Sequence, residues 1–368
     1  MANEFATLQT IARAALPQLI DNLVFPNLVY RDFSDDFAGQ GDTIQVRKPV
    51  TLEAREFVQA NGVSYEDITE ETVPVTLDKL VTVDVAATAV ETATNLEDLN
   101  RAFIEPAAAA LAEKINADGL QLYAEVPAVV NASGHDLAAL AAVRKAMNLR
   151  RIPTSGRVAV WDPEADAAFA TLPALVNAEK SGSVEALREG AIGRVFGMDN
   201  YMSQAVARHT TGITAATAVK VNGAVSAGAN KLSIDGTSLV GKLVKGDVLT
   251  IGGRDFVVTK DSANAASNAI ANVEVSPALP AIADNADVTL AGSHTANLAF
   301  HPMAFAYVTR PLYNPDGEGV ASYVTSYNGI SLRVTRGYDQ KYKKSVYSMD
   351  VLYGYKCVYP ELAVRAMG

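Results

Sequence analysis

The stretch Thr94–Tyr123 reads TNLEDLNRAFIEPAAAALAEKINADGLQLY, and its apolar residues return every three or four positions. This spacing predicts an amphipathic helix, with Thr94 and Glu97 as a capping box at its start. About 30 residues at ~1.5 Å each would make a rod of about 45 Å. Pro106 lacks a backbone N–H, so a kink is expected about midway. Periodicity alone fits a central core helix equally well. The apolar stripe consists of Leu96, Leu99, Phe103, Ala107, Leu111 and Ile115.

Upstream of this helix, two segments alternate apolar and polar residues, which is typical of strands. About 20 mainly polar residues separate them, including the acidic Glu66, Asp67, Glu70 and Glu71. Two long strands with an acidic tip predict a projecting flap, which needs a partner or stays mobile. The apolar faces are formed by Ile44, Val46 and Val50 in the first segment, and by Val73, Val75, Leu77, Val81, Val83 and Val85 in the second.

Helices and short strands alternate in the segments around the flap and the long helix. Residues 5–20 predict an amphipathic helix that Pro17 interrupts and Pro26 ends, with too little Lys and Arg for a membrane-surface helix. Further elements are expected as a helix capped by Asp136, a buried strand at 158–161, a helix started by Asp162-Pro163, and a short helix at 183–190.

Residues 206–297 differ in texture, because Phe256 is their only aromatic residue and Ala, Val, Gly and Thr abound. Gly252-Gly253 predicts a tight hairpin between two of six short strands. Such strands suggest a small barrel or sandwich, inserted between segments that read as one domain. The strands are expected at Val219–Val221, Leu232–Ile234, Val248–Ile251, Phe256–Thr259, Val273–Val275 and Val288–Leu290.

The last segment returns to long strands. Ile330, Leu332 and Val334 alternate with polar residues, and every odd position from Tyr347 to Tyr359 is apolar.

Composition describes a folded protein, with 49% hydrophobic and 20% charged residues. A single cysteine, no apolar run of ~20 residues and no basic N-terminal start predict a protein made and used in the cytoplasm. Residues 1–125 hold 21 acids and 8 bases, whereas residues 298–368 hold 5 acids and 8 bases. The acidic front and the basic tail could attract one another between copies. The acidic balance disfavours tight nucleic-acid binding.

No motif predicts a catalytic, cofactor or metal site. Gly236–Lys242 matches a phosphate-binding loop except that Leu243 replaces the magnesium-binding Ser or Thr, and the following residues read as strand. Cys357 lies on an apolar strand face, where an inert thiol is expected. The four histidines have no second His or Cys at metal-ligand spacing. They are His135, His209, His294 and His301.

Four stretches of the sequence resemble the major capsid proteins of tailed bacteriophages, which share the Hong Kong ninety-seven fold. Arg101–Asn116 resembles their spine helix, Leu187–Gly197 a stretch of their axial domain, and Asn297–Leu312 the motif that follows the insertion of one phage branch. Lys245–Gly252 resembles a phrase of that branch's inserted β-barrel. The resemblance implies an α+β capsid fold with a long spine helix, an extended β-hairpin loop and an inserted all-β barrel.

The resemblance also implies a division of the chain into six parts. The expected parts are an N-terminal arm (1–40), an extended loop with a peripheral strand (41–92), a peripheral domain with the spine helix (93–130), an axial domain (131–205), the inserted barrel (206–297) and return strands (298–368).

The implied function is assembly: hexamers and pentamers of the chain would form an icosahedral shell around double-stranded DNA, without sequence-specific DNA binding, membrane, cofactor or catalysis. Scaffolding protein and portal are expected partners, with a decoration protein as a further candidate, and assembly is expected in the host cytoplasm. The flap would clasp the adjacent subunit, so its charged residues are candidate inter-subunit contacts. These are Arg47, Lys48, Arg55, Glu66, Glu70 and Glu71.

Three other functions fit the sequence less well than a phage capsid protein. An encapsulin, a bacterial nanocompartment protein, has the same fold, but the inserted barrel favours the phage branch. A hydrolase with an appended β-domain lacks any supporting constellation of residues. A carbohydrate-binding β-protein is opposed by the helix-rich middle and the absent signal peptide.

Overall fold

A computed structural model describes residues 8–31, 43–47, 59, 72–88, 105–176, 192–315, 320–327 and 330–368. Its chain divides into two compact units, each formed from several stretches of sequence. The first unit contains Met1–Pro17, Arg31–Ala107 and Ala306–Tyr359; the second contains Gln18–Tyr30, Ala108–Phe305 and Pro360–Gly368.

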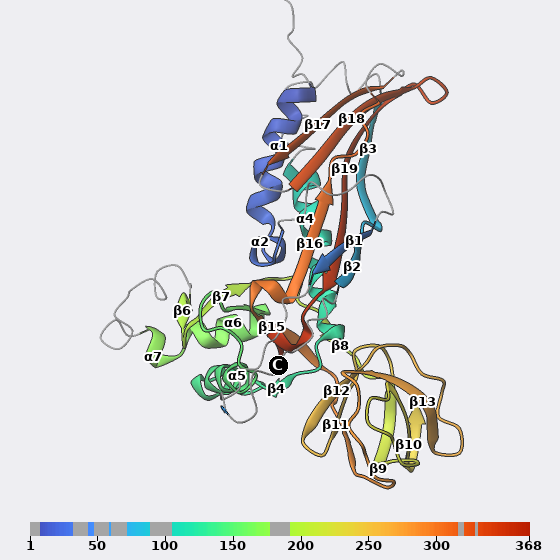
Figure 1. Cartoon of the computed structure of the whole chain (residues 1–368). Coiled ribbons are helices and arrows are strands. Elements are labelled where there is room, and N and C mark those ends of the chain that lie inside the picture. Colours follow the sequence, from blue (N-terminus) through green and yellow to red (C-terminus); the bar gives the residue numbers. More distant parts are fainter. Residues whose placement is uncertain are drawn as a thin grey trace, which may run out of the picture. The chain divides into compact units, whose positions relative to one another are not determined.

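A five-stranded sheet is the main element of the first unit (Figure 1). Its order is β16-β19-β18-β17, with β3 pairing antiparallel to β19. The alternation predicted for β19 is only partly observed, because Met349–Gly354 is buried on both faces. Even-numbered Leu352 packs in a cluster with Val75 and Val308. The strands are β3 (Lys79–Thr88), β16 (Phe305–Arg310), β17 (Ala321–Tyr327), β18 (Ile330–Asp339) and β19 (Lys344–Cys357).

The predicted flap begins as an antiparallel pair of β1 (Thr43–Arg47) and β2 (Thr72–Thr76). The expectation of one long second strand is wrong, because the chain leaves the ladder at Leu77-Asp78 before β3 begins. Leu77 is fully buried in the first unit, and Gly354 allows this close approach, since a Cβ on it would lie 2.1 Å from the Thr76 carbonyl oxygen. The acidic tip lies outside the described residues.

The expected interruption of the N-terminal helix at Pro17 and its end at Pro26 are both wrong. Helix α1 (Leu8–Asn22) runs through Pro17 without a break, and Pro26 lies inside the short α2 (Phe25–Leu28) instead of ending α1. The Pro17 ring is exposed, so its main cost is one lost backbone hydrogen bond. Burial of the apolar stripe on either side of Pro17 offsets that cost. The stripe includes Ala12, Ala15, Leu16 and Leu19.

The C-terminal half of the predicted long helix is confirmed as α4 (Glu105–Leu120), which is followed by the 3₁₀ helix η2 (Gln121–Glu125). Residues 94–104, with the predicted capping box, lie outside the described residues, so the expected kink is not tested. On α4, the Asn116 carboxamide oxygen accepts hydrogen bonds from the backbone N–H groups of Val24 and Phe25 at 3.1 and 3.2 Å. This side chain therefore satisfies the start of α2.

A second sheet, of seven strands, belongs to the second unit. Its order is β4-β20-β15-β5-β7-β6, and β8 pairs with β15. The strands are β4 (Val129–Asn131), β5 (Val158–Trp161), β6 (Arg194–Val195), β7 (Met198–Met202), β8 (Arg208–His209), β15 (His294–Phe300) and β20 (Ala363–Met367).

Helices α5 (Leu137–Leu149), α6 (Pro163–Ala170) and α7 (Pro173–Val176) accompany the seven-stranded sheet, with the 3₁₀ turns η3 (Pro302–Ala304) and η4 (Pro360–Leu362). Both predicted caps are confirmed. The Asp136 carboxylate accepts from the Ala139 N–H at 2.7 Å, and the Asp162 carboxylate accepts from the Glu164 N–H at 3.2 Å. The helix predicted at 183–190 lies outside the described residues.

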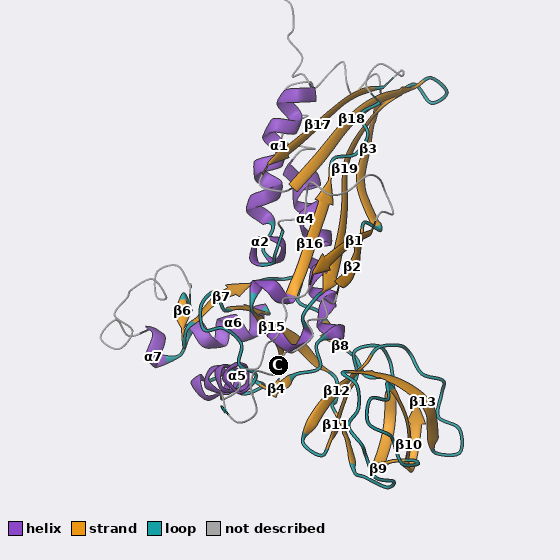
Figure 2. Cartoon of the chain, viewed as in Figure 1, coloured by secondary structure: helices purple, strands orange, loops and turns teal. Residues whose placement is uncertain are grey.

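All six strands expected in the insertion are present, and no helix interrupts them (Figure 2). Their order is β14-β11-β12-β13-β10-β9. The outer strands approach through a bridge of Lys220 with Asp287, and the Val221 N–H donates to the Ala286 carbonyl at 2.9 Å, which closes the barrel. The strands are β9 (Ile213–Val221), β10 (Lys231–Gly241), β11 (Val248–Ile251), β12 (Arg254–Val258), β13 (Ala269–Ser276) and β14 (Val288–Leu290).

Aliphatic side chains fill the barrel around one aromatic ring, that of Phe256, which is 2% exposed. Gly252 and Gly253 have φ angles of +57° and +76°, which the predicted two-residue hairpin between β11 and β12 requires. Gly236–Gly241 of the imperfect phosphate-loop sequence lies within β10. The residues after it, expected as strand, form a turn at Lys245-Gly246 before β11 begins at Val248, and no helix follows them.

We expect Phe256→Ala to lower the free energy of unfolding of the barrel by about 3–5 kcal/mol, because the surrounding aliphatic residues cannot close the cavity. Denaturant unfolding followed by circular dichroism measures the change. Val240→Ala is the control, since Val240 is 53% exposed in the same barrel. Equal losses in the two variants would contradict the single-core description.

Candidate functional site: the buried polar junction of the barrel

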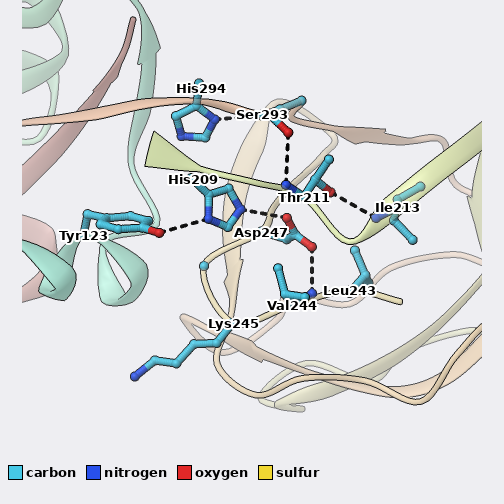
Figure 3. Close-up of polar contacts among 12 residues, drawn as sticks. Tyr123, His209, Thr211, Ile213, Leu243, Val244, Lys245, Asp247, Ser293 and His294 are labelled. Carbon is cyan, nitrogen blue, oxygen red and sulfur yellow. Dashed lines mark hydrogen bonds and ion pairs between the residues drawn. The ribbon is translucent and has the colours of Figure 1, made fainter. Parts of the chain in front are cut away.

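Five polar side chains from five separate elements meet where the inserted barrel joins the rest of the second unit. Each is at most 7% exposed. Helix η2, strands β8, β15 and β20, and the turn before β11 supply them (Figure 3 shows four of the five). They are Tyr123, His209, Asp247, His294 and Arg365.

His209 is the centre of this group. Its Nε2 lies 2.8 Å from an Asp247 carboxylate oxygen, and its Nδ1 lies 3.1 Å from the Tyr123 hydroxyl. The other Asp247 oxygen accepts from the Val244 N–H at 2.8 Å. A neutral His209 satisfies this chain of groups when its Nε2 donates a hydrogen bond to Asp247 and its Nδ1 accepts one from the Tyr123 hydroxyl. The network therefore links η2, β8 and the barrel (Figure 3).

Arg365 lies in the apolar strand β20 and has no exposed surface. Its guanidinium donates to the Gly246 carbonyl at 2.7 Å, to the Val126 carbonyl at 3.1 Å and to the Tyr123 carbonyl. The guanidinium carbon also lies 4.9 Å from the centre of the Tyr123 ring. Burial lowers the pKa of Arg365 to about 10, so the group is still a cation at neutral pH.

His294 completes the group, with its ring centre 5.4 Å from that of His209. Its Nδ1 donates to the Gly292 carbonyl at 2.7 Å, and its buried Nε2 has no hydrogen-bond partner among the described residues. Burial lowers the pKa of His294; the nearby Arg365 and His209 lower it further, whereas the Gly292 carbonyl and Asp247 oppose the shift. Burial also raises the pKa of Tyr123.

Close backbone contact brings these groups together. Gly246 has φ +96°, and a Cβ there would lie 3.1 Å from that of Ala124 and 3.3 Å from the His209 ring. Only glycine combines this conformation with this approach. Beside it, Lys245 makes a 3.1 Å ion pair with Glu125. The turn that precedes β11 is therefore shaped to lie against η2.

A Tyr–His–Asp chain resembles a proton relay, but the environment favours a structural role. The His209 and Asp247 side chains are 4% and 2% exposed, which gives a substrate no access to either. Among the described residues, no group of three His, Cys, Asp or Glu side chains is arranged to hold a metal ion. What the arrangement can do is fix the barrel in one orientation on the seven-stranded sheet.

Of the residues predicted as inter-subunit contacts, only Arg47 falls within the described residues, where it ends β1 and is aligned with Thr72 of β2. Sequence reasoning missed the buried junction. His209 and His294 are far apart in the chain, and the antiparallel pairing of β8 with β15 brings their rings together. One available signal was Arg365, a single cation within an apolar strand.

Comparison with solved structures finds phage proteins with a similar fold. A solved structure from Mycobacterium phage Che8 is 17% identical, with a TM-score of 0.53, over 94% of this chain and 90% of that one. A capsid structure of the cyanophage P-SCSP1u is 14% identical, with a TM-score of 0.49, over 94% and 88%. No curated protein matches the chain.

The family model described as P22 coat protein – gene protein 5 matches residues 1–241. The chain belongs to this family, and it is a major capsid protein. The encapsulin alternative is the weaker fit, because the matching family is one of phage coat proteins. None of the described helices is both long and apolar enough to cross a membrane.

We expect Asp247→Ala to lower the free energy of unfolding by about 3 kcal/mol or more, since His209 and the Val244 N–H would lose their buried acceptor. Urea unfolding of the unassembled protein measures the loss. Asp287→Ala is the matched control, because this barrel aspartate is 91% exposed and should change stability by at most about 0.5 kcal/mol. A loss in Asp247→Ala as small as in the control would contradict the network.

The lowered pKa of His294 predicts a pH dependence. Because the folded protein binds this proton less tightly than the unfolded chain, the stability is fully present above the ordinary histidine pKa of about 6.5 and falls as the pH drops below it. We expect the unfolding free energy of the wild type to fall more steeply between pH 7.5 and 5.5 than that of His294→Gln. Both proteins retain His301, whose pKa burial also lowers, so its contribution cancels. Equal slopes would contradict the assignment.

Proposed function

We propose that copies of this chain form hexamers and pentamers of an icosahedral shell around double-stranded phage DNA. One observation carries the proposal beyond family membership. Among the described strands, β1 pairs with β2 and with no other. The second edge of β1 therefore has no ladder partner among the described strands, and such an unpaired strand edge is suited to contact with another copy.

The expected division of the chain becomes part of this proposal. Residues 1–40 would act as an arm, 41–92 as the extended loop, 93–130 as the peripheral domain, 131–205 and 298–368 as the axial domain and return strands, and 206–297 as the barrel. Arm and loop would clasp neighbouring subunits. The buried junction would give every copy the same barrel orientation, which a regular shell needs.

The contact residues are proposed from the same ribbon. The Arg47 backbone ends β1 on the side of the loop that joins it to β2, and the other five candidates follow within that loop. They are Lys48, Arg55, Glu66, Glu70 and Glu71.

The proposed role is structural rather than enzymatic and needs no cofactor. A net charge of −10 suits a container whose wall must not hold the packaged genome, since phosphate binding draws on Lys and Arg. Scaffolding protein and portal are the proposed partners, with a decoration protein as a further candidate, and assembly takes place in the host cytoplasm.

Expression of the chain alone, followed by electron microscopy and sedimentation, tests the proposal. We expect shells or capsomers from the wild type. For Glu70→Lys combined with Glu71→Lys, we expect a shell yield lower by about tenfold, because two charges of the proposed loop contact are reversed.

The control is E274K/D287K, which makes the same charge change at barrel side chains that are 38% and 91% exposed, and it should assemble normally. A compact monomer at every wild-type concentration would contradict self-assembly. Unchanged assembly by the Glu70 and Glu71 variant would contradict the role of the loop alone.

A further inference from the structure

A dense basic patch lies at the end of helix α5 in this acidic protein. No Asp or Glu occurs between residues 137 and 157, while five cations do. Four of the five are exposed or half-exposed, and Arg157 is buried beneath them. We call the exposed group the α5 patch; it consists of Arg144, Lys145, Arg150 and Arg151, with Leu149 among them.

The α5 patch is almost uncompensated within the subunit. Arg150 makes one long ion pair, 3.9 Å to Asp255, and its three companions make none among the described residues. The pKa of Arg157 is lowered by burial and by the charge of Arg144, so the cations repel each other. Leu149 is 74% exposed. An apolar side chain ringed by Arg and Lys fits an acidic protein surface better than a phosphate backbone, which needs no apolar contact.

The first turn of α6 carries the opposite charge. Glu164 and Asp166 follow the capping residue Asp162 there, and neither pairs with a cation among the described residues. Burial raises the pKa of Asp166, and the neighbouring charge of Asp162 raises it further. An added cation from outside would stabilise the ionised carboxylate.

These two charged surfaces make no ion pair with each other among the described residues. Arg157, under the α5 patch, precedes the strand β5, whereas Asp162, which caps α6, follows it. A basic surface at one end of β5 and an acidic surface at the other are arranged for contact with a second copy.

We propose that the α5 patch of one subunit binds the acidic first turn of α6 on the next, head to tail, with Leu149 as the central apolar anchor. The inference rests on the proposed self-assembly and assigns one of its interfaces. Such a heterologous contact generates closed rings when the rotation between copies closes, which is what hexamers and pentamers require. Charge complementarity sets the orientation of each subunit relative to the next one in the ring.

A charge-swap experiment tests this interface. Both R144E/K145E and E164K/D166K should raise the protein concentration needed for half-maximal capsomer formation by about tenfold or more. The combined four-residue variant should recover to within about threefold of the wild type, because the reversed surfaces again attract. Sedimentation measures assembly, and circular dichroism of the unassembled protein shows that each variant is folded. R254E/K260E, with the same charge change at exposed barrel residues, is the control.

Each outcome of this experiment either supports or overturns the proposed interface. Rescue in the combined variant, with a control that assembles normally, supports the pairing. Loss without rescue would overturn it and indicate another occupant, such as residues 177–191 of the same chain or a polyanion. Wild-type shells with unaffected single-surface variants would overturn this interface but leave the proposed function intact. A wild type that never assembles would overturn both.

Discussion

The buried guanidinium of Arg365 is the constraint on which the second unit depends. It donates to carbonyls on both sides of a junction, Gly246 in the inserted segment and Tyr123 and Val126 after α4. Removing a cation from water is costly unless hydrogen bonds replace its hydration, so this strand position is stable only while those carbonyls stay in place. The sheet, the end of the long helix and the barrel therefore specify one another.

The stability of the inserted barrel and its orientation depend on different interactions. Its aliphatic core around Phe256 is closed and local, and this core gives the barrel its own stability. Its orientation depends instead on directional polar contacts, above all the chain of Tyr123, His209 and Asp247. Hydrogen bonds impose geometry that apolar packing alone does not. In a shell made of many identical copies, that geometry matters as much as stability.

Much of the fold was predictable because periodicity and capping are local. The six barrel strands, the Asp136 and Asp162 caps and the later part of the long helix were all expected and observed. Local rules failed where distant packing decides. Pro17 predicts a break in the first helix, but α1 continues through it because its apolar stripe is buried. The alternating segment predicts one strand, but it forms two, β2 and β3, with the buried Leu77 between them. The junction was not predictable, since His209 and His294 become neighbours only through the pairing of β8 with β15.

Native-state hydrogen exchange on Arg365→Met measures most directly whether the junction holds the barrel to the sheet. In the wild type, the amide of Arg365, bonded to the Ala128 carbonyl, and that of Gly246, bonded to the Val258 carbonyl, should exchange with the same opening free energy. In Arg365→Met, the Gly246 amide should lose protection while amides in the Phe256 core keep theirs. Unchanged protection at Gly246 in the variant would contradict the account.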